Sequence, residues 1–154
     1  MSRPLSDDPA TASMGRSRRR ALTYDDLPPE MKEAIQDYLR HTNASLRAAV
    51  KDYFEDKAAT EREWGKIGTW DVGRVTDMLE LFRGRTDFDE DLGAWDTSSV
   101  TTMKAMFATC YSYTGQGIGA WDTSSVKNMS LMFDGCHAFC ADIGAWDTSV
   151  TKWK

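Results

Sequence analysis

The sequence predicts an α/β fold in which a short repeat solenoid follows an N-terminal helical cap. The first observation is a repeated stretch, Ile-Gly-Ala-Trp-Asp-Thr-Ser-Ser-Val at 118–126, which has close copies on both sides. The second is its period, since the tryptophans at 70, 95, 121 and 146 lie 25, 26 and 25 residues apart. A fixed period of this size is the sequence signature of stacked repeats. The third is a pair of amphipathic segments before the first repeat.

These patterns divide the chain into three parts. We expect a disordered tail at 1–22, a helical cap at 23–64, and a repeat solenoid at 65–154 with three units and a truncated fourth. A chain of 154 residues has room for one such domain. Its net charge of −5 offers no large basic field, so no nucleic acid partner is expected. No apolar run reaches the roughly eighteen residues that a membrane-spanning helix needs.

The tail carries a basic cluster at Arg16, Arg18, Arg19 and Arg20 but no apolar centre of a secretory signal peptide. Its polar composition favours disorder. A nuclear-import patch and an arginine-rich transit peptide are the alternatives, and the acidic pair ahead of the cluster weighs against the second. Because no signal peptide is seen, we expect an intracellular location.

Two amphipathic helices are expected in the cap. The first begins at Pro28-Pro29, because proline suits the first turn of a helix. Its apolar residues form one stripe: Leu27, Met31, Ala34, Ile35, Tyr38 and Leu39. The second is expected to run from Asn43 to Trp64, where Gly65 ends it. We expect this second helix to cover the open edge of the first repeat, and target binding is its alternative role.

Each repeat is expected to contain a strand, a turn, a short helix and a returning loop. In the stretch 120–123, tryptophan and threonine would face one side and aspartate the other, as in a strand. The apolar residues that follow are spaced by three and four, as on one face of a helix, and the serines before them can cap it. The equivalent residues form five columns: Trp70, Trp95, Trp121 and Trp146; Asp71, Asp96, Asp122 and Asp147; Val75, Val100 and Val126; Met78, Met103 and Met129; Phe82, Phe107 and Phe133.

These columns resemble a known family. The run Trp-Asp-Thr-Ser-Ser-Val-x-x-Met-x-x-Met-Phe-x-x-Cys is similar to the roughly 26-residue repeat of BspA-type bacterial surface proteins, which is related to leucine-rich repeats. The resemblance covers Ile67 to Trp153. It implies a leucine-rich-repeat-like solenoid and a role in binding or adhesion, and it brings no catalytic residues. Where the family has asparagine after the closing aromatic residue, this chain has Asp89, Thr114 and Cys140.

The tryptophan and aspartate columns each allow two interpretations. Tryptophans could form a stacking surface for sugars or bases, but their register with threonine favours a buried ladder. Stacked aspartates would repel one another unless something offsets their charge. Capping of the following turn needs no further component. Calcium between the coils is the alternative, although the glycine-rich calcium repeat is absent.

The spacing of the cysteines favours a packing role over zinc binding. Cys110, Cys136 and Cys140 occur with His137, but the paired spacing of zinc ligands is missing. Cys110 and Cys136 occupy one repeat column, where small apolar side chains pack. We expect these two at the ends of short helices, too far apart for a disulfide, as free thiols.

The predicted function is a non-catalytic module for protein–protein interaction or adhesion, with an unidentified protein partner. We expect no enzyme, cofactor or metal, because no nucleophile–base set and no phosphate-binding glycine loop is recognised. The alternative is a ligand- or calcium-binding repeat that uses the aspartate and the serine and threonine columns. The last unit breaks off after Val150 and Trp153, before its Met-Phe pair. We expect a truncated and frayed last coil, and self-association through this open face is the alternative.

Overall fold

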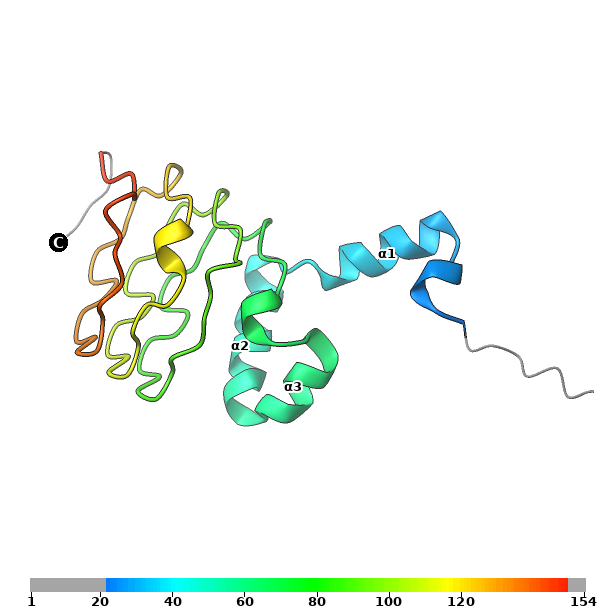
Figure 1. The fold of residues 1–154 in the computed structure, drawn as a ribbon, viewed down its shortest axis with the longest axis horizontal. Helices are drawn as coiled ribbons and strands as arrows, with labels where there is room; N and C mark the ends of the chain where they lie inside the picture. Colours follow the sequence, from blue (N-terminus) through cyan, green and yellow to red (C-terminus); the bar gives the residue numbers. More distant parts are fainter. Residues whose placement is uncertain (1–21, 150–154) are drawn as a thin grey trace, which may run out of the picture.

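The computed structural model describes residues 22–149. Three α-helices come first: α1 (Pro29–Leu39), α2 (Asn43–Glu55) and α3 (Lys57–Trp64). The rest winds into a body of stacked coils, with α2 and α3 against one end and α1 projecting away (Figure 1). There are also short 3-10 helices: η1 (Tyr24–Asp26), η2 (Ile67–Thr69) and η3 (Ile118–Ala120). The predicted disorder of the tail and the expected end at Val150 and Trp153 concern positions outside the described residues.

The first two helices begin at caps that the sequence supplies. Pro28 and Pro29 stand at the N-cap and the first position of α1, where a missing N–H leaves no helical bond unmade. Thr42 caps α2, since its hydroxyl accepts a hydrogen bond from the Ser45 amide at 3.2 Å. The Thr42 amide in turn donates to the Ser45 hydroxyl at 2.8 Å. Both starts agree with the prediction.

The second predicted helix is two helices rather than one. After α2, Asp56 takes φ −146° and ψ 88°, outside the helical region. Its carboxylate then accepts a hydrogen bond from the Ala59 amide at 2.9 Å, which caps α3. Trp64 ends α3, and Gly65 follows with a positive φ of 77°. The prediction of one continuous helix over 43–64 is therefore wrong.

The repeats do not form the predicted α/β solenoid of strands and short helices. We call residues 67–91, 92–117 and 118–142 the first, second and third coils. The described coils contain no β-strand, and no α-helix follows α3 within them. Parallel pairing is limited in this part of the chain to isolated bridges: Arg40–Asp71, Asp77–Thr102 and Thr102–Asn128. Turns and hydrogen bonds between coils take the place of both predicted elements.

The segment predicted as a helix in each repeat is a run of overlapping turns. In the second coil, the Met106 amide donates to the Met103 carbonyl, and the Ala108 amide donates to the Ala105 carbonyl, both at 3.1 Å. Ala105 has φ 52°, which turns the chain out of a right-handed helix. The equivalent residues of the first and third coils have φ 54° and 59°: Glu80 and Leu131.

The alternate amides of these turns bind the next coil. Four amides of the first coil donate to four carbonyls of the second at 2.9–3.0 Å: Met78 to Thr102, Glu80 to Lys104, Phe82 to Met106 and Gly84 to Ala108. Four amides of the second coil donate to the third at 2.6–3.0 Å: Met103 to Asn128, Ala105 to Ser130, Phe107 to Met132 and Thr109 to Asp134. Because these amides are satisfied between coils, the i→i−4 bonds of a helix do not form.

The segment predicted as a strand is joined to its neighbours by side chains. The Trp121 indole Nε1 donates to the Leu92 carbonyl of the preceding coil at 2.9 Å. The Thr97 hydroxyl donates to the Asp122 carbonyl of the following coil at 2.9 Å. These bonds hold the coils together on this side without the repeated backbone pairs that define a strand.

Two aromatic columns stack through the body. One has ring centroids 5.4 and 5.8 Å apart: Phe82, Phe107 and Phe133. The other has centroids 6.5 and 6.2 Å apart: Trp95, Trp121 and Trp146. Each repeat tryptophan, Trp70 included, is at most 6% exposed, which agrees with a core ladder rather than an open stacking surface. The valine and methionine columns are also buried: Val75, Val100, Val126, Met78, Met103 and Met129.

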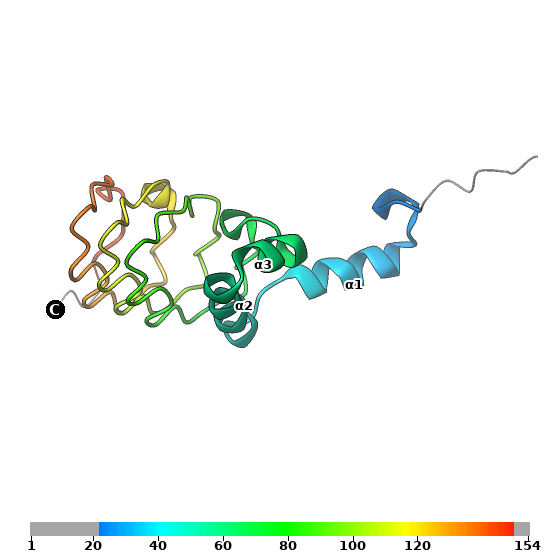
Figure 2. The same cartoon turned by 90° about the horizontal axis from the view of Figure 1, so that it is seen from below.

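α2 covers the side of the first coil that no other coil covers. The Asn43 side-chain carbonyl accepts hydrogen bonds from the Thr76 and Asp77 amides at 2.8 and 3.1 Å. Arg47 donates to the Leu79 carbonyl at 2.7 Å and pairs with the Asp77 carboxylate at 2.9 Å. Figure 2 shows α2 and α3 against this end of the body. Three backbone groups on this side of the first coil are thus bound by side chains of α2.

Candidate protein-interaction surface

Among residues 22–149, the helix α1 has an amphipathic face whose apolar side chains are mostly exposed. No residue of α1 is buried. Its apolar side chains follow the spacing i, i+3, i+4, i+7, so they share one side of the helix. Met31 is 53% exposed, Ile35 36% and Tyr38 63%. We call these three residues, together with Ala34, the α1 apolar face.

The C-terminal end of α1 is fixed to the body although this face is open. The Tyr38 ring stacks on Trp64 of α3 with centroids 5.3 Å apart. Asp37 pairs with Arg74 of the first coil at 2.6 Å. Figures 1 and 2 both show α1 extending away from the body rather than folding back on it. The apolar face is therefore held in place but not covered.

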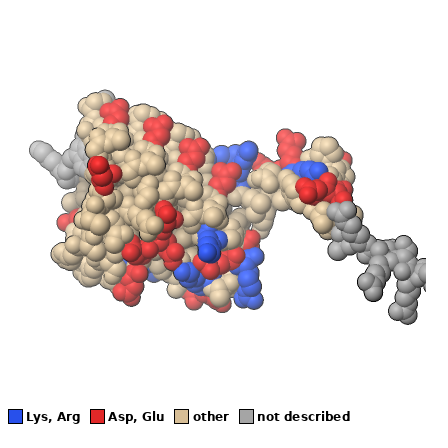
Figure 3. Space-filling view, in the orientation of Figure 1, with Lys and Arg blue, Asp and Glu red and all other residues tan. Residues whose placement is uncertain are grey.

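Acidic side chains flank the α1 apolar face on one side. Glu30, Glu33 and Asp37 are spaced by three and four residues, so they form a stripe of their own. Glu30 and Glu33 form no ion pair with any residue of 22–149. In Figure 3, acidic side chains also follow the upper rim of the body, whereas basic ones gather near its junction with the helices. A surface that complements α1 would be apolar with a basic margin.

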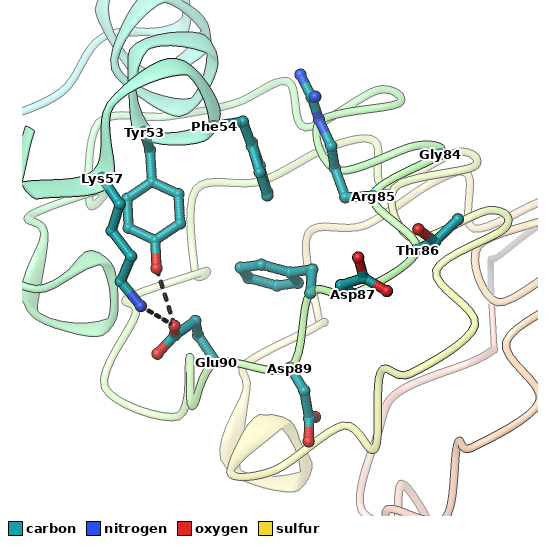
Figure 4. Close-up of a pocket in the computed structure, with 10 residues that line it drawn as sticks. Tyr53, Phe54, Lys57, Gly84, Arg85, Thr86, Asp87, Asp89 and Glu90 are labelled. Carbon is teal, nitrogen blue, oxygen red and sulfur yellow. Dashed lines mark hydrogen bonds and ion pairs between the residues drawn. The ribbon is translucent and has the colours of Figure 1, made fainter.

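A hollow between the helices and the first coil is the second candidate site (Figure 4). The Arg85 guanidinium lies over the Phe54 ring at 4.2 Å. Glu90 accepts hydrogen bonds from the Tyr53 hydroxyl at 2.9 Å and from the Lys57 ammonium at 2.5 Å. The lining comes from α2 and the start of α3 on one side and from the coil on the other: Tyr53, Phe54 and Lys57, and 84–90.

The hydrogen bonds between Glu90, Lys57 and Tyr53, together with burial, shift the pKa values of all three groups. The hydrogen bond from Lys57 holds the pKa of Glu90 below its ordinary value, and the same bond raises the pKa of Lys57. Burial raises the pKa of Tyr53 to about 12. Near neutral pH the three groups are a carboxylate, an ammonium ion and a neutral phenol. The hydrogen bonds of Glu90 with Tyr53 and Lys57 join α2 and the start of α3 to the first coil.

The carboxylates of the aspartate column stabilise the turns that directly follow them. Each carboxylate accepts the backbone amide two residues further on, at 2.9–3.1 Å: Asp71 from Gly73, Asp96 from Ser98, Asp122 from Ser124 and Asp147 from Ser149. Hydrogen bonds from these serines hold the pKa of three of the carboxyls below the ordinary value: Asp96, Asp122 and Asp147. Residues 22–149 hold no group of three or more side chains placed to bind a metal ion. The geometry therefore gives the calcium alternative no support.

The cysteines pack between coils. Cys110 and Cys136 donate their thiols to the carbonyls of Phe82 and Phe107, at 3.0 and 2.9 Å. All three cysteines are free, and Cys140 is exposed. Burial raises the pKa of Cys110 to about 12 and raises that of Cys136 as well. The short helices expected to carry Cys110 and Cys136 are turns, and neither thiol has the lowered pKa of a nucleophile.

The structure thus places the predicted columns in the core and in turns, and the candidate surfaces elsewhere. The apolar stripe of α1 was visible in the sequence, but its lack of a cover was not. The contacts of Glu90 with Tyr53 and Lys57 join residues 33 to 37 positions apart, and no sequence motif marks them. None of the helices in the described region has the length and apolar character to cross a membrane.

Comparison with known proteins finds a family model that matches most of the chain. Residues 48–153 match the family model described as Mycoplasma protein of unknown function, DUF285. No curated protein and no solved structure matches the chain. The matched region begins inside α2 and takes in the coils, so α1 precedes it.

Proposed function

Since the chain belongs to the DUF285 family, whose description states no activity, we propose a function from geometry and chemistry. The protein is a non-catalytic interaction module that binds a partner protein through the α1 apolar face. One observation carries this proposal: Met31, Ile35 and Tyr38 are exposed along one side of a helix whose end is fixed. The resemblance to BspA-type repeats supports the same class of function, because it implies binding or adhesion.

The energetics of α1 support a bound partner. Isolated helices shorter than about 12–15 residues are marginal in water, and α1 has 11 residues. Burial of apolar surface contributes about 25 cal/mol per Å², so covering this face would stabilise both the helix and the complex. Laying an apolar helix face into a groove is a common mode of peptide recognition. The acidic stripe at Glu30 and Glu33 favours a groove with basic side chains on its margin.

A pull-down with the intact chain tests the proposal, using two matched variants of α1. Ile35→Glu places a carboxylate on the apolar face, whereas Gln36→Glu places the same group on the polar side one residue later. We expect wild type and Gln36→Glu to retain the same protein, and Ile35→Glu to lose it. The captured protein is then purified and titrated directly, where Ile35→Glu should weaken binding at least about tenfold, the equivalent of about 1.4 kcal/mol.

Two results would contradict this function. Equal binding by Ile35→Glu and Gln36→Glu, with helix content unchanged by circular dichroism, would remove α1 from the interface. Thermal unfolding with and without calcium chloride tests the alternative function, a calcium-binding repeat. A cation that binds only the folded state must raise its stability, so a calcium-dependent rise in Tm would favour an ion-binding role for the aspartate column.

A further inference from the structure

A buried histidine lies where α1 joins the rest of the molecule. His41 stands in the short link between α1 and α2. Its side chain is 0% exposed and packs between two indoles, with ring centroids 4.7 Å from Trp64 of α3 and 5.1 Å from Trp70 of the first coil. The other histidine of the chain, His137, is exposed. A group that can titrate near neutral pH is therefore enclosed at the junction between α1 and the body.

Four rings connect the core of the coils with α1. Trp70 contacts His41, His41 contacts Trp64, and Trp64 stacks on Tyr38 of the α1 apolar face with centroids 5.3 Å apart. The His41 amide also donates to the Asp71 carbonyl at 2.8 Å. Because His41 lies between two of these rings, displacement of its side chain would remove the support of Trp64 and, through it, that of Tyr38.

The surroundings of His41 suit a neutral imidazole. Nδ1 lies 3.4 Å from the Ser45 hydroxyl of α2, whereas Nε2 is buried and has no hydrogen-bond partner among residues 22–149. Both ring nitrogens of an imidazolium carry a proton, so protonation would leave a charged N–H at Nε2 without an acceptor or water. Burial lowers the pKa of His41, and the nearby Asp71 carboxylate opposes this in part.

The charged groups around this junction are already paired. Arg40, which precedes His41, binds the Asp71 carboxylate at 3.2 Å, so its positive charge offsets the attraction of Asp71 for an imidazolium. On α3, Glu63 accepts a hydrogen bond from the Tyr38 hydroxyl at 3.3 Å. The two indoles are tilted from the imidazole by 42° and 46°, so neither presents its face squarely to a cation there.

We propose that His41 is a pH-sensitive switch, in which the neutral ring fixes α1 to the body and protonation at mildly acidic pH releases it. In the released state, the imidazolium leaves the two indoles for water, and the bond from its amide to Asp71 and the contact of Trp64 with Tyr38 are broken. The consequence for a partner rests on the proposed function. A released α1 of 11 residues is a marginal helix, so binding through its apolar face should weaken as pH falls.

The direction of the switch follows from the two states of His41. The released side chain has the ordinary pKa of 6.5, whereas the fixed side chain has a lower pKa. The released state therefore takes up the proton first and becomes more favourable as pH falls below 6.5. For one proton, the release equilibrium can shift by up to about tenfold between pH 7.5 and 5.5.

Amide hydrogen exchange of the intact, free chain at these two pH values tests the proposal. The amide at position 41 is protected by the Asp71 carbonyl, so it reports release directly. After correction for the intrinsic rate at each pH, it should exchange about three- to tenfold faster at pH 5.5. It should also exchange faster than the Phe107 amide of the second coil at both pH values, because release of α1 needs no global unfolding.

Two variants assign the effect to one imidazole. His41→Phe keeps a ring between the indoles without a titratable nitrogen, so its exchange at position 41 should change by less than about twofold. His137→Gln is the matched control and should respond like wild type. It also leaves a single imidazole, whose midpoint in an NMR titration should lie below 6.5. The NMR midpoint and the wild-type exchange decide even if His41→Phe does not fold.

Three results would overturn the switch. An NMR midpoint of 6.5 or higher would mean that the junction does not disfavour the charged ring. Equal corrected exchange at pH 7.5 and 5.5 would mean that α1 stays fixed when His41 titrates. The same acceleration in His41→Phe would assign the effect to another group. The proposed function fails separately, because the Ile35→Glu comparison is made at pH 7.5 with a partner, whereas these measurements use the free chain.

Discussion

At the scale of single residues, the Tyr113 hydroxyl is an unfavourable polar group in the apolar core. The side chain is fully buried, and its hydroxyl has no hydrogen-bond partner in the described part of the chain. Burial raises the pKa of this phenol well above its ordinary value. The first and third coils have phenylalanine at the equivalent positions, Phe88 and Phe139, which need no partner. The repeat thus offers its own comparison for this hydroxyl.

We therefore expect Tyr113→Phe to stabilise the protein. A buried polar group without a partner costs about 1–3 kcal/mol, and the ring can keep its stacking on Phe107 at 4.1 Å. The free energy of unfolding in urea should rise by about 1 kcal/mol. The reverse substitution in the first coil, Phe88→Tyr, is the matched control and should lower it. A loss of stability in Tyr113→Phe would show that the hydroxyl has a partner.

A second residue-scale prediction concerns pH and the Glu90 contacts. The folded state lowers the pKa of Glu90, so this carboxylate stabilises the fold above its ordinary pKa of 4.5, and the contribution is lost as pH falls. The folded state raises the pKa of Lys57, so its contribution is present below the ordinary 10.5 and lost at higher pH. The pair therefore stabilises the protein most between about pH 5 and 10.

Glu90→Gln should lower the free energy of unfolding inside this window and have little effect at pH 3. The pair is partly exposed, so we expect a loss of at most about 1 kcal/mol at pH 7. Urea denaturation of wild type and variant at both pH values measures the difference. Glu55→Gln, in the exposed pair with Lys51, is the control and should change little at either pH. An equal effect of Glu90→Gln at pH 3 and pH 7 would contradict the assignment.

At the scale of elements, the runs of turns depend on positive φ at fixed places. The last such place in each run is Gly84, Thr109 or Gly135, with φ 76°, 60° and 72°. Glycine adopts this conformation without strain, whereas a left-handed β-branched residue is disfavoured by about 1–2 kcal/mol. The second coil therefore carries strain that its neighbours avoid.

Thr109→Gly should relieve this strain and raise the free energy of unfolding. Glycine loses more backbone entropy on folding, so the net gain should be about 0.5–1 kcal/mol. Gly84→Thr makes the opposite change, and a Cβ there would meet its nearest neighbour, Thr109 Oγ1, at 3.9 Å. That site has room, so its expected loss of about 1 kcal/mol isolates the effect of φ. Thermal unfolding of both variants measures these changes. A lower Tm for Thr109→Gly would contradict the assignment of backbone strain to Thr109.

These turns also explain which parts of the fold the sequence could predict. The start of α1 followed from Pro28-Pro29, and the repeat period identified equivalent residues. The choice between helix and turns did not follow, because Val126, Met129 and Met132 have a spacing that serves both. What separates the two is where alternate amides donate, and their acceptors lie about 25 residues away in the next coil. The local sequence of one coil therefore does not show which carbonyl each amide binds.

The strand prediction failed for a related reason. Trp121 and Thr123 do point into the body, as alternation requires, and both are buried. They bind the neighbouring coils through the Trp121 indole and the Thr123 hydroxyl, however, rather than through paired backbone groups. The candidate surface shows the same limit, since a stripe on α1 is a property of sequence, whereas its lack of a cover is a property of tertiary packing.

At the scale of the whole molecule, the two ends of the stack differ in how they are protected. The first coil is covered by α2 through Asn43 and Arg47, and the second coil lies between two others. The third coil is joined to the second through its whole run of turns, while its outer amides are unpaired within residues 22–149. In stacked repeats, stability is roughly a sum of repeat and interface contributions. Local opening should therefore begin at the third coil.

The three cysteines report on this order, since they differ in burial and in coil. Cys140 is exposed, Cys136 of the third coil is partly buried, and Cys110 of the second coil is fully buried. Under native conditions a thiol reagent should modify Cys140 first, then Cys136 through opening of the third coil, and Cys110 last. Mass spectrometry of peptides after timed alkylation measures the three rates.

Labelling in urea provides the control, because the unfolded chain should expose all three thiols alike. A native-state rate at Cys110 equal to that at Cys136 would mean that the stack opens as one unit, which would contradict graded stability along it.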